Sequence, residues 1–215
     1  MNYGPKVFTL SMDHYQEKFK QSIKGNVLVC IDAANLERSV KTMWVNPKDI
    51  PDEFKRYQSG ELCYRVDYQK VKDFFQSNGL LNQVRMYTAD FGTLSHRNFL
   101  AFLHKRLHFK LITKPLKEYQ DHSENYPHRK ANFDVELSID ATYLLKEFDT
   151  LILFSGDCDF EYLLKFFRGQ GKKTIVFSRS GHVAKELPPA CNQYFDIVDF
   201  RNVLLRIDRK AKNPA

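Results

Sequence analysis

The sequence has few of the features that mark secreted, membrane-embedded or disulfide-stapled proteins. Its 215 residues contain only four cysteines, Cys30, Cys63, Cys158 and Cys191, and none belongs to a C-x-x-C pair. No apolar run approaches 18 residues, and the N-terminal residues lack the basic-then-apolar pattern of a signal peptide. We therefore expect free or buried thiols, no membrane association and a reducing, cytoplasmic setting.

Three common catalytic motifs are missing as well. The chain contains no P-loop, no G-x-G-x-x-G and no G-x-S-x-G, which argues against dinucleotide chemistry and acyl transfer. What it does contain is an excess of positive charge, since 33 Lys and Arg face 26 Asp and Glu, for a net charge of +7. Such a balance favours polyanionic partners.

Apolar runs alternate with amphipathic segments over residues 25–200. The predicted strands are 26–31, 81–88, 110–116, 150–154 and 174–178, and the predicted helices are 68–77, 95–109, 133–147 and 160–168. Alternation this regular predicts an α/β protein with a three-layer α/β/α, Rossmann-like fold and a mostly parallel central sheet.

Three segments depart from this alternation. Residues 1–24 are mixed and polar and are predicted to be an N-terminal arm. Residues 37–63 hold the only tryptophan, two prolines and many charges, so we interpret them as an insertion or lid within the 25–200 domain. Residues 201–215 are predicted to begin as a helix and to end as a basic, mobile tail.

Aspartates follow several of the predicted strands, at the edge of the sheet where α/β proteins bind ligands. Asp32 follows the first strand, Asp90 follows the second, and Asp157 and Asp159 follow the run LILF. Asp134 lies in the first turn of a predicted helix. Because carboxylates at this density repel one another, we expect a hard divalent cation, Mg²⁺ or Mn²⁺ rather than Zn²⁺. A metal held in this way can promote cleavage of a phosphodiester.

Asp32, Asp134, Asp157 and Asp159 each also have an ordinary explanation as a helix cap or a residue of a first helical turn. Asn35 has two interpretations, as a group that orients a phosphate or metal-bound water and as a turn residue. Lys130 is either a partner of the scissile phosphate or a solvated lysine. Asp140 lies about 120° around the helix from Asp134, so we predict a supporting or surface position for it. The joint placement of carboxylates from four segments favours the functional interpretation.

Four motifs, in order, resemble the NYN domain family, a LabA-like branch of the PIN-like ribonuclease superfamily. They are Ile31-Asp32-Ala33-Ala34-Asn35, then Pro115-Leu116-Lys117, then Lys130 followed by Asp134-Val135-Glu136-Leu137-Ser138-Ile139-Asp140, and finally Ser155-Gly156-Asp157-Cys158-Asp159-Phe160. The resemblance covers residues 25–200 and implies a PIN-like fold with an acidic, Mg²⁺- or Mn²⁺-binding site that cleaves RNA.

Residue roles follow from the resemblance position by position. It implies that the catalytic, metal-binding carboxylates are Asp32, Asp134, Asp157 and Asp159. The supporting residues would be Asn35, Asp90, Lys130, Asp140 and Ser155, with Asp90 resting on the strand prediction alone. Basic candidates for RNA contact are Arg97, Lys105, Arg129, Lys130 and Arg179.

The leading hypothesis is therefore a metal-dependent endoribonuclease. A non-catalytic RNA-binding or regulatory module is the first alternative, and another Rossmannoid phosphoesterase is the second. The second fits less well, because TOPRIM domains place a glutamate where Asp32 stands and haloacid-dehalogenase-type enzymes place D-x-D at the first strand. The sequence leaves open a homo-oligomer.

Overall fold

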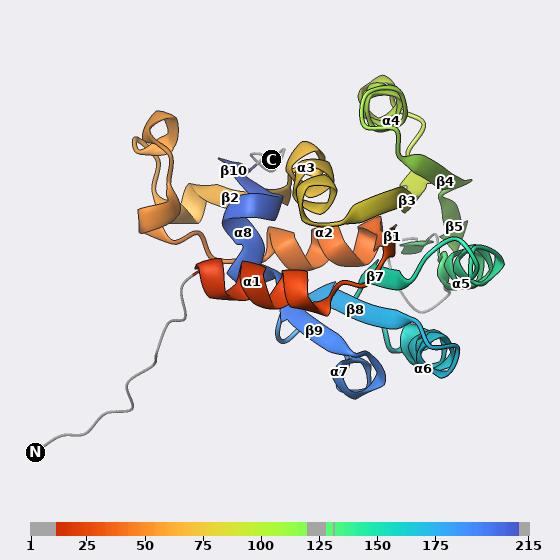
Figure 1. Cartoon of the computed structure of the whole chain (residues 1–215). Coiled ribbons are helices and arrows are strands. Elements are labelled where there is room, and N and C mark those ends of the chain that lie inside the picture. Colours follow the sequence, from red (N-terminus) through yellow and green to blue (C-terminus); the bar gives the residue numbers. More distant parts are fainter. Residues whose placement is uncertain (1–11, 120–127, 131, 211–215) are drawn as a thin grey trace, which may run out of the picture.

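Six parallel strands form a central sheet that helices cover on both faces (Figure 1). This computed structural model describes residues 12–119, 128–130 and 132–210. The strand order is β4-β3-β1-β7-β8-β9. The strands span β1 Asn26–Asp32, β3 Leu80–Asp90, β4 Lys110–Pro115, β7 Thr150–Phe154, β8 Lys173–Ser178 and β9 Gln193–Asp196. The predicted fold class is confirmed.

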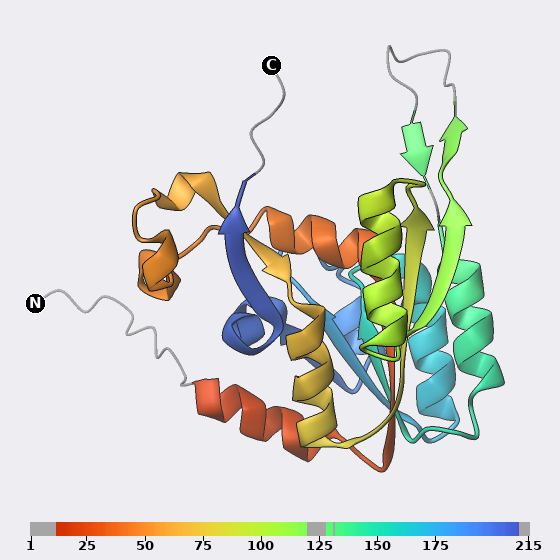
Figure 2. The same ribbon diagram turned by 90° about the horizontal axis from the view of Figure 1, so that it is seen from above.

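Each face of the sheet has its own hydrophobic core and its own helices. Along β1, Val27, Val29 and Ile31 point into one core, whereas Leu28 and Cys30 point into the other. The first face carries α1 Met12–Ser22, α2 Ala33–Lys41, α3 Tyr68–Asn78, α4 Leu94–Lys105 and α8 Arg201–Leu204. The second carries α5 Asp134–Tyr143, α6 Glu161–Gly169 and α7 Leu187–Ala190. Burial on both faces explains why the central strands β1 and β7 are apolar without interruption, and Figure 2 shows the layers from above.

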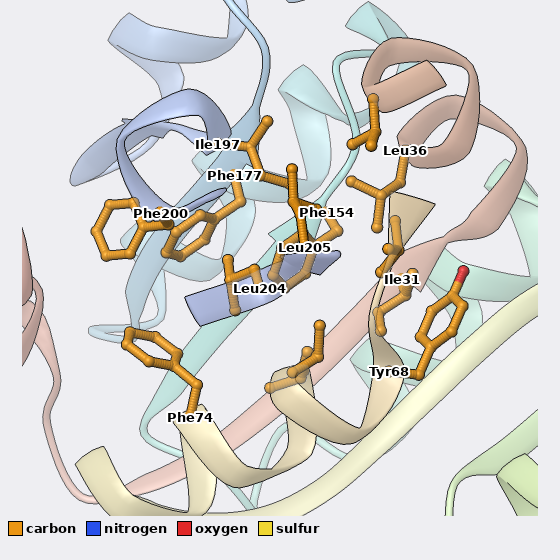
Figure 3. Close-up of a cluster of buried hydrophobic side chains, with 14 of the residues drawn as sticks. Ile31, Leu36, Tyr68, Phe74, Phe154, Phe177, Ile197, Phe200, Leu204 and Leu205 are labelled. Carbon is orange, nitrogen blue, oxygen red and sulfur yellow. The ribbon is translucent and has the colours of Figure 1, made fainter. Parts of the chain in front are cut away.

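Helix α1, within the predicted N-terminal arm, belongs to the first core. Its Phe19 is fully buried and meets Phe74 of α3, Phe177 of β8 and Phe200 at ring-centroid distances of 5.0, 5.7 and 6.2 Å. Figure 3 shows Phe74, Phe177 and Phe200 converging in this cluster. A buried phenylalanine contributes about 1.5–3 kcal/mol, so this helix is anchored to the domain.

The C-terminal part of the chain contains a strand that the sequence prediction assigned to a mobile tail. β10 Leu205–Arg209 pairs antiparallel with β2 Leu62–Val66, which lies at the end of the predicted insertion. The structure therefore differs from that prediction between residues 205 and 209. The physical reason is a period of two, because Leu205 and Ile207 alternate with the charged Arg206 and Asp208.

An ion pair between Asp49 and Arg201 connects the rest of the predicted insertion to α8. Residues 37–41 are the last turns of α2, and the turns η1 Pro47–Asp49, η2 Asp52–Phe54 and η3 Ser59–Glu61 lead from α2 to β2. The Asp49 carboxylate accepts hydrogen bonds from Arg201 Nε at 2.6 Å and Tyr64 OH at 2.9 Å. Burial opposes the charge of Asp49, yet these bonds lower its pKa below the ordinary value.

A third, two-stranded sheet pairs β5 Lys117–Tyr119 antiparallel with β6 His128–Lys130. Within the described ranges, no helix is both long enough and apolar enough to span a lipid bilayer.

Candidate functional site

A cavity of about 330 Å³ lies at the carboxyl ends of β1 and β7, beside the start of α5. β1 and β7 are paired neighbours, with Ile31 opposite Phe154, so the residues that follow them emerge at one edge of the sheet. The cavity is lined by all four of the predicted catalytic carboxylates, Asp32, Asp134, Asp157 and Asp159. The fold thus brings together side chains from three distant segments of the chain.

Asp32 is at once a helix cap and a cavity carboxylate. One oxygen accepts from the backbone N–H of Asn35 at 3.2 Å, which caps α2, and the other accepts from Ser155 Oγ at 3.1 Å. Burial and, among the charges, that of Asp157 raise the pKa of Asp32 above its ordinary value. The ionised form is therefore less stable here than in water, despite the two hydrogen bonds.

The turn after β7 is pinned from two sides. The Ser155 hydroxyl that donates to Asp32 also accepts from the backbone N–H of Asp157 at 3.2 Å. The Asn35 side-chain oxygen accepts from the N–H of Gly156 at 2.8 Å. Asn35 and Ser155, both predicted as supporting residues, therefore connect the start of α2 to the turn that carries Asp157.

Asp157 and Asp159 form the tightest acidic group among the described residues. Asp157 caps the turn η4 Cys158–Phe160 by accepting from the N–H of Asp159 at 3.2 Å. Ligand atoms of Asp157, Cys158 and Asp159 all lie within 4.8 Å of one another. Asp32 and Asp134 are outside this close group but line the same cavity.

Asp134 opens α5 at the far wall of the cavity. Its backbone N–H donates to Asn132 Oδ1 at 3.1 Å, and Lys114 Nζ donates to the Asn132 carbonyl at 2.9 Å. Burial, followed by the charges of Asp157, Asp159 and Asp32, raises the pKa of Asp134. The carboxylates on opposite walls are therefore close enough to repel one another.

Two further predicted acids do not line the cavity. Asp140 accepts from Arg85 at 2.6 Å and from Tyr87 OH at 3.1 Å, which joins α5 to β3. Asp90, at the end of β3, accepts from the N–H of Gly92 at 2.8 Å and so stabilises its own loop.

The predicted basic residues are scattered. Arg179 donates to the carbonyl of Ser39 at 3.1 Å and to Thr42 Oγ1 at 2.6 Å, which holds the loop after β8 against the end of α2. Arg97 and Lys105 are exposed on α4, outside the acidic cavity. Arg129 and Lys130 belong to β6, and their side chains fall outside the described part of the structure.

Arg38 and Phe91 line the cavity although sequence reasoning did not select them. Arg38 lies on α2 three residues after Asn35, so both residues share a helix face. If Asp32 is interpreted as the cap of a helix, the three-residue spacing from Asn35 to Arg38 predicts that Arg38 lies on the same side as Asn35. Phe91 is 55% exposed in the loop after β3, and no sequence pattern distinguishes it from a core residue.

Ser155→Ala is expected to destabilise the metal-free protein by about 2 kcal/mol, because it leaves the charged Asp32 carboxylate and the Asp157 N–H without their shared partner. Urea unfolding measures the change. Ser178→Ala is a matched control, since Ser178 is equally buried and its Oγ has no hydrogen-bond partner among the described residues. Equal losses of stability in the two variants would contradict the bridging role of Ser155.

Comparison with known proteins matches residues 26–205 to the NYN domain. The chain is 36% identical over 104 residues to the "Low amplitude and bright protein LabA" of Synechococcus elongatus. That alignment covers 48% of this chain and 56% of LabA, so the match extends over about half the length of this curated relative. A solved structure of a Vibrio parahaemolyticus protein of unknown function superimposes with a TM-score of 0.62 at 19% identity. It covers 84% of this chain and 96% of that one, and it supports the fold alone.

Proposed function

This chain belongs to the NYN domain family, and from that premise we propose that it is a metal-dependent endoribonuclease that hydrolyses RNA phosphodiester bonds in the acidic cavity. NYN domains are related to the PIN-like nucleases, which generally use divalent metals. The observation that carries the proposal is the convergence of Asp32, Asp134 and Asp157 on one cavity from β1, α5 and the end of β7.

The donor set fits a hard divalent cation. Among the described residues that line the cavity, the four ionisable acids are all aspartates and none of the lining residues is a histidine. Carboxylate oxygens suit Mg²⁺ and Mn²⁺. The carboxylates that would hold the metal are Asp32, Asp134, Asp157 and Asp159. When bound, such a cation polarises a phosphoryl oxygen and lowers the pKa of water.

Other residues in and beside the cavity orient the Asp157 carboxylate and provide a positive charge. Ser155 and Asn35 hold the turn that carries Asp157, so this carboxylate is oriented before any ligand arrives. Arg38 places a guanidinium on the wall of the same cavity, where it can neutralise a phosphate of the RNA backbone. Hydrolysis at such a site is expected to leave a 5′-phosphate and a 3′-hydroxyl.

Cleavage of end-labelled single-stranded RNA tests the proposal, with Mg²⁺, with Mn²⁺ and with EDTA. We expect cleavage with either metal and none with EDTA. Asp157→Asn is expected to slow it by about 10³-fold or more. Asp90→Asn is the matched control, because Asp90 carries the same charge outside the cavity, and it should retain wild-type activity.

Equal cleavage by Asp157→Asn and the wild type would refute the assignment of the site. RNA binding without cleavage under either metal would favour the non-catalytic module. Turnover of p-nitrophenyl phosphate without RNA cleavage would favour a different phosphoesterase.

A further inference from the structure

We propose that a groove next to the acidic cavity, here called the basic groove, binds the single-stranded RNA that flanks the scissile bond. The basic groove has a volume of about 500 Å³, and its lining includes Arg38, Lys41, Arg65 and Arg206. This inference rests on the proposed ribonuclease function and deepens it, because it assigns a path and a strand form to the substrate.

One side of the basic groove is a face of α2, and the other is the β2–β10 pair. Ala34, Arg38 and Lys41 follow one another at helical spacings of four and three, so they share the exposed face of α2. Arg65 of β2 and Arg206 of β10 come from the small sheet, which lies beside α2 in Figures 1 and 2. Cations from three elements therefore meet in a single groove.

Arg65 and Arg206 stand directly opposite each other in the β2–β10 pairing. Like charges at opposed positions destabilise a sheet, so this pair favours an anionic ligand between or beside them. Asp208 lies 3.3 Å from Arg65 and 3.7 Å from Arg206. The two arginine side chains are 42% and 56% exposed, so these ion pairs are weak and leave both guanidiniums open to a ligand.

The described lining of the basic groove is positively charged overall. It contains four basic residues, Arg38, Lys41, Arg65 and Arg206, and one acidic residue, Glu37. Glu37 accepts a hydrogen bond from Tyr68 OH at 2.7 Å. A phosphodiester backbone matches such a surface, because each phosphate that displaces counterions adds to affinity.

The basic groove adjoins the acidic cavity. Ala34 and Arg38 line both, so the two cavities adjoin and a bound strand can contact both. A third cavity also touches Ala34 and is lined by Phe91, His96 and Phe99. The exposed Phe91 ring, 4.6 Å from the His96 ring, lines this cavity and the acidic one. A nucleobase can stack on such a ring only when it is unpaired, which favours single-stranded RNA over a duplex.

The test is binding of a fluorescent oligoribonucleotide of about twelve nucleotides, in EDTA so that no cleavage occurs. The double variant Arg65→Gln/Arg206→Gln is expected to bind about tenfold more weakly. The negative slope of log affinity against log salt should become shallower by about 1.4, because two phosphate contacts are lost. Phe91→Ala should weaken binding about tenfold with an unchanged slope. The matched control, Lys24→Gln/Lys173→Gln, removes the same charge at exposed positions beside the amino ends of β1 and β8, away from the groove, and should bind as the wild type does.

The arginine variant is expected to keep its unfolding midpoint, since it removes a like-charge repulsion together with two weak, exposed ion pairs to Asp208. If that midpoint falls, Lys41→Gln on α2 gives an independent test. The slope of its log affinity against log salt should become shallower by about 0.7. A duplex of the same sequence should bind more weakly than the single strand, and equal affinity would overturn the single-strand assignment.

Cleavage assays separate the groove from the ribonuclease activity. With metal, the arginine variant should cleave the long substrate poorly but an oligonucleotide of about three nucleotides as well as the wild type does. Wild-type cleavage together with unchanged binding in the groove variants would overturn the basic groove and leave the proposed function intact. Groove-dependent binding without any cleavage by the wild type would refute the ribonuclease and, with it, the role beside a scissile bond.

Discussion

Asp32→Asn is expected to abolish RNA cleavage and, at the same time, to raise the stability of the metal-free protein at neutral pH. Cleavage should fall by about 10³-fold or more, because a carboxylate of the proposed metal site is lost. The stability gain follows from removing a charge whose burial is unfavourable and which Asp157 repels. Asparagine keeps an oxygen for the N–H of Asn35, and Ser155 can accept from its amide.

The pH dependence of that gain has a definite sign. The folded-state pKa of Asp32 is raised above its ordinary value of 3.8, so the folded protein binds more protons than the unfolded chain between these two values. The advantage of Asp32→Asn should be complete above the raised pKa, shrink as the pH falls, and vanish below 3.8. Urea unfolding in EDTA over a pH series measures it. A variant less stable than the wild type at every pH would show that capping of α2 is the main role of Asp32.

Gly156→Ala is expected to destabilise the protein by about 3 kcal/mol and to impair cleavage severely. A Cβ at this position would lie 2.2 Å from the backbone oxygen of His182 and 2.7 Å from Ser178 Oγ. The His182 loop cannot retreat freely, since the N–H of Ala184 donates to the Gly156 carbonyl at 2.9 Å. The turn must therefore move, and it carries Asp157 with it.

Gly169→Ala provides the matched comparison for this prediction. Gly169 is the last residue of α6, and a Cβ there meets nothing within 4 Å. Alanine should leave stability unchanged or raise it by up to about 1 kcal/mol. Urea unfolding and RNA cleavage of both variants decide the matter, and equal stability of the two would contradict the close approach at Gly156.

The centre of the fold was predictable because strands β1 and β7 are buried on both faces. Runs such as VLVCI in β1 and LILF in β7 are apolar without interruption, which is characteristic of the centre of a parallel sheet. β2 and β10 lack that signal, because each has a charged residue facing the solvent and gains its partner only through the tertiary fold. Local patterns therefore identified five of the six strands of the central sheet, and missed β9 and both two-stranded sheets.

The carboxylates of the site were predictable for a related reason. Asp32 and Asp157 follow strands that pair in parallel, so topology alone brings them to one edge. The 120° offset of Asp140 from Asp134 around α5 also predicted a position away from the metal site. Its partners, Arg85 and Tyr87, lie more than fifty residues earlier in the chain, so no local pattern identifies them. The cations were harder to assign, because exposed lysines and arginines occur throughout the chain and only the tertiary fold gathers Arg38, Arg65 and Arg206.

The pairing of β10 with β2 also bears on the order in which parts of the protein form during synthesis. Chains are made from the N-terminus, and Asp32, Asp134 and Asp157 all precede Arg206. The carboxylates of the acidic cavity are therefore synthesised before the basic groove can form, since the groove requires β10 to pair with β2 across a separation of more than a hundred residues. Until then the edge of β2 has no partner among the described strands of its sheet. During that interval the unpaired edge of β2 can pair with the wrong segment or with a neighbouring chain.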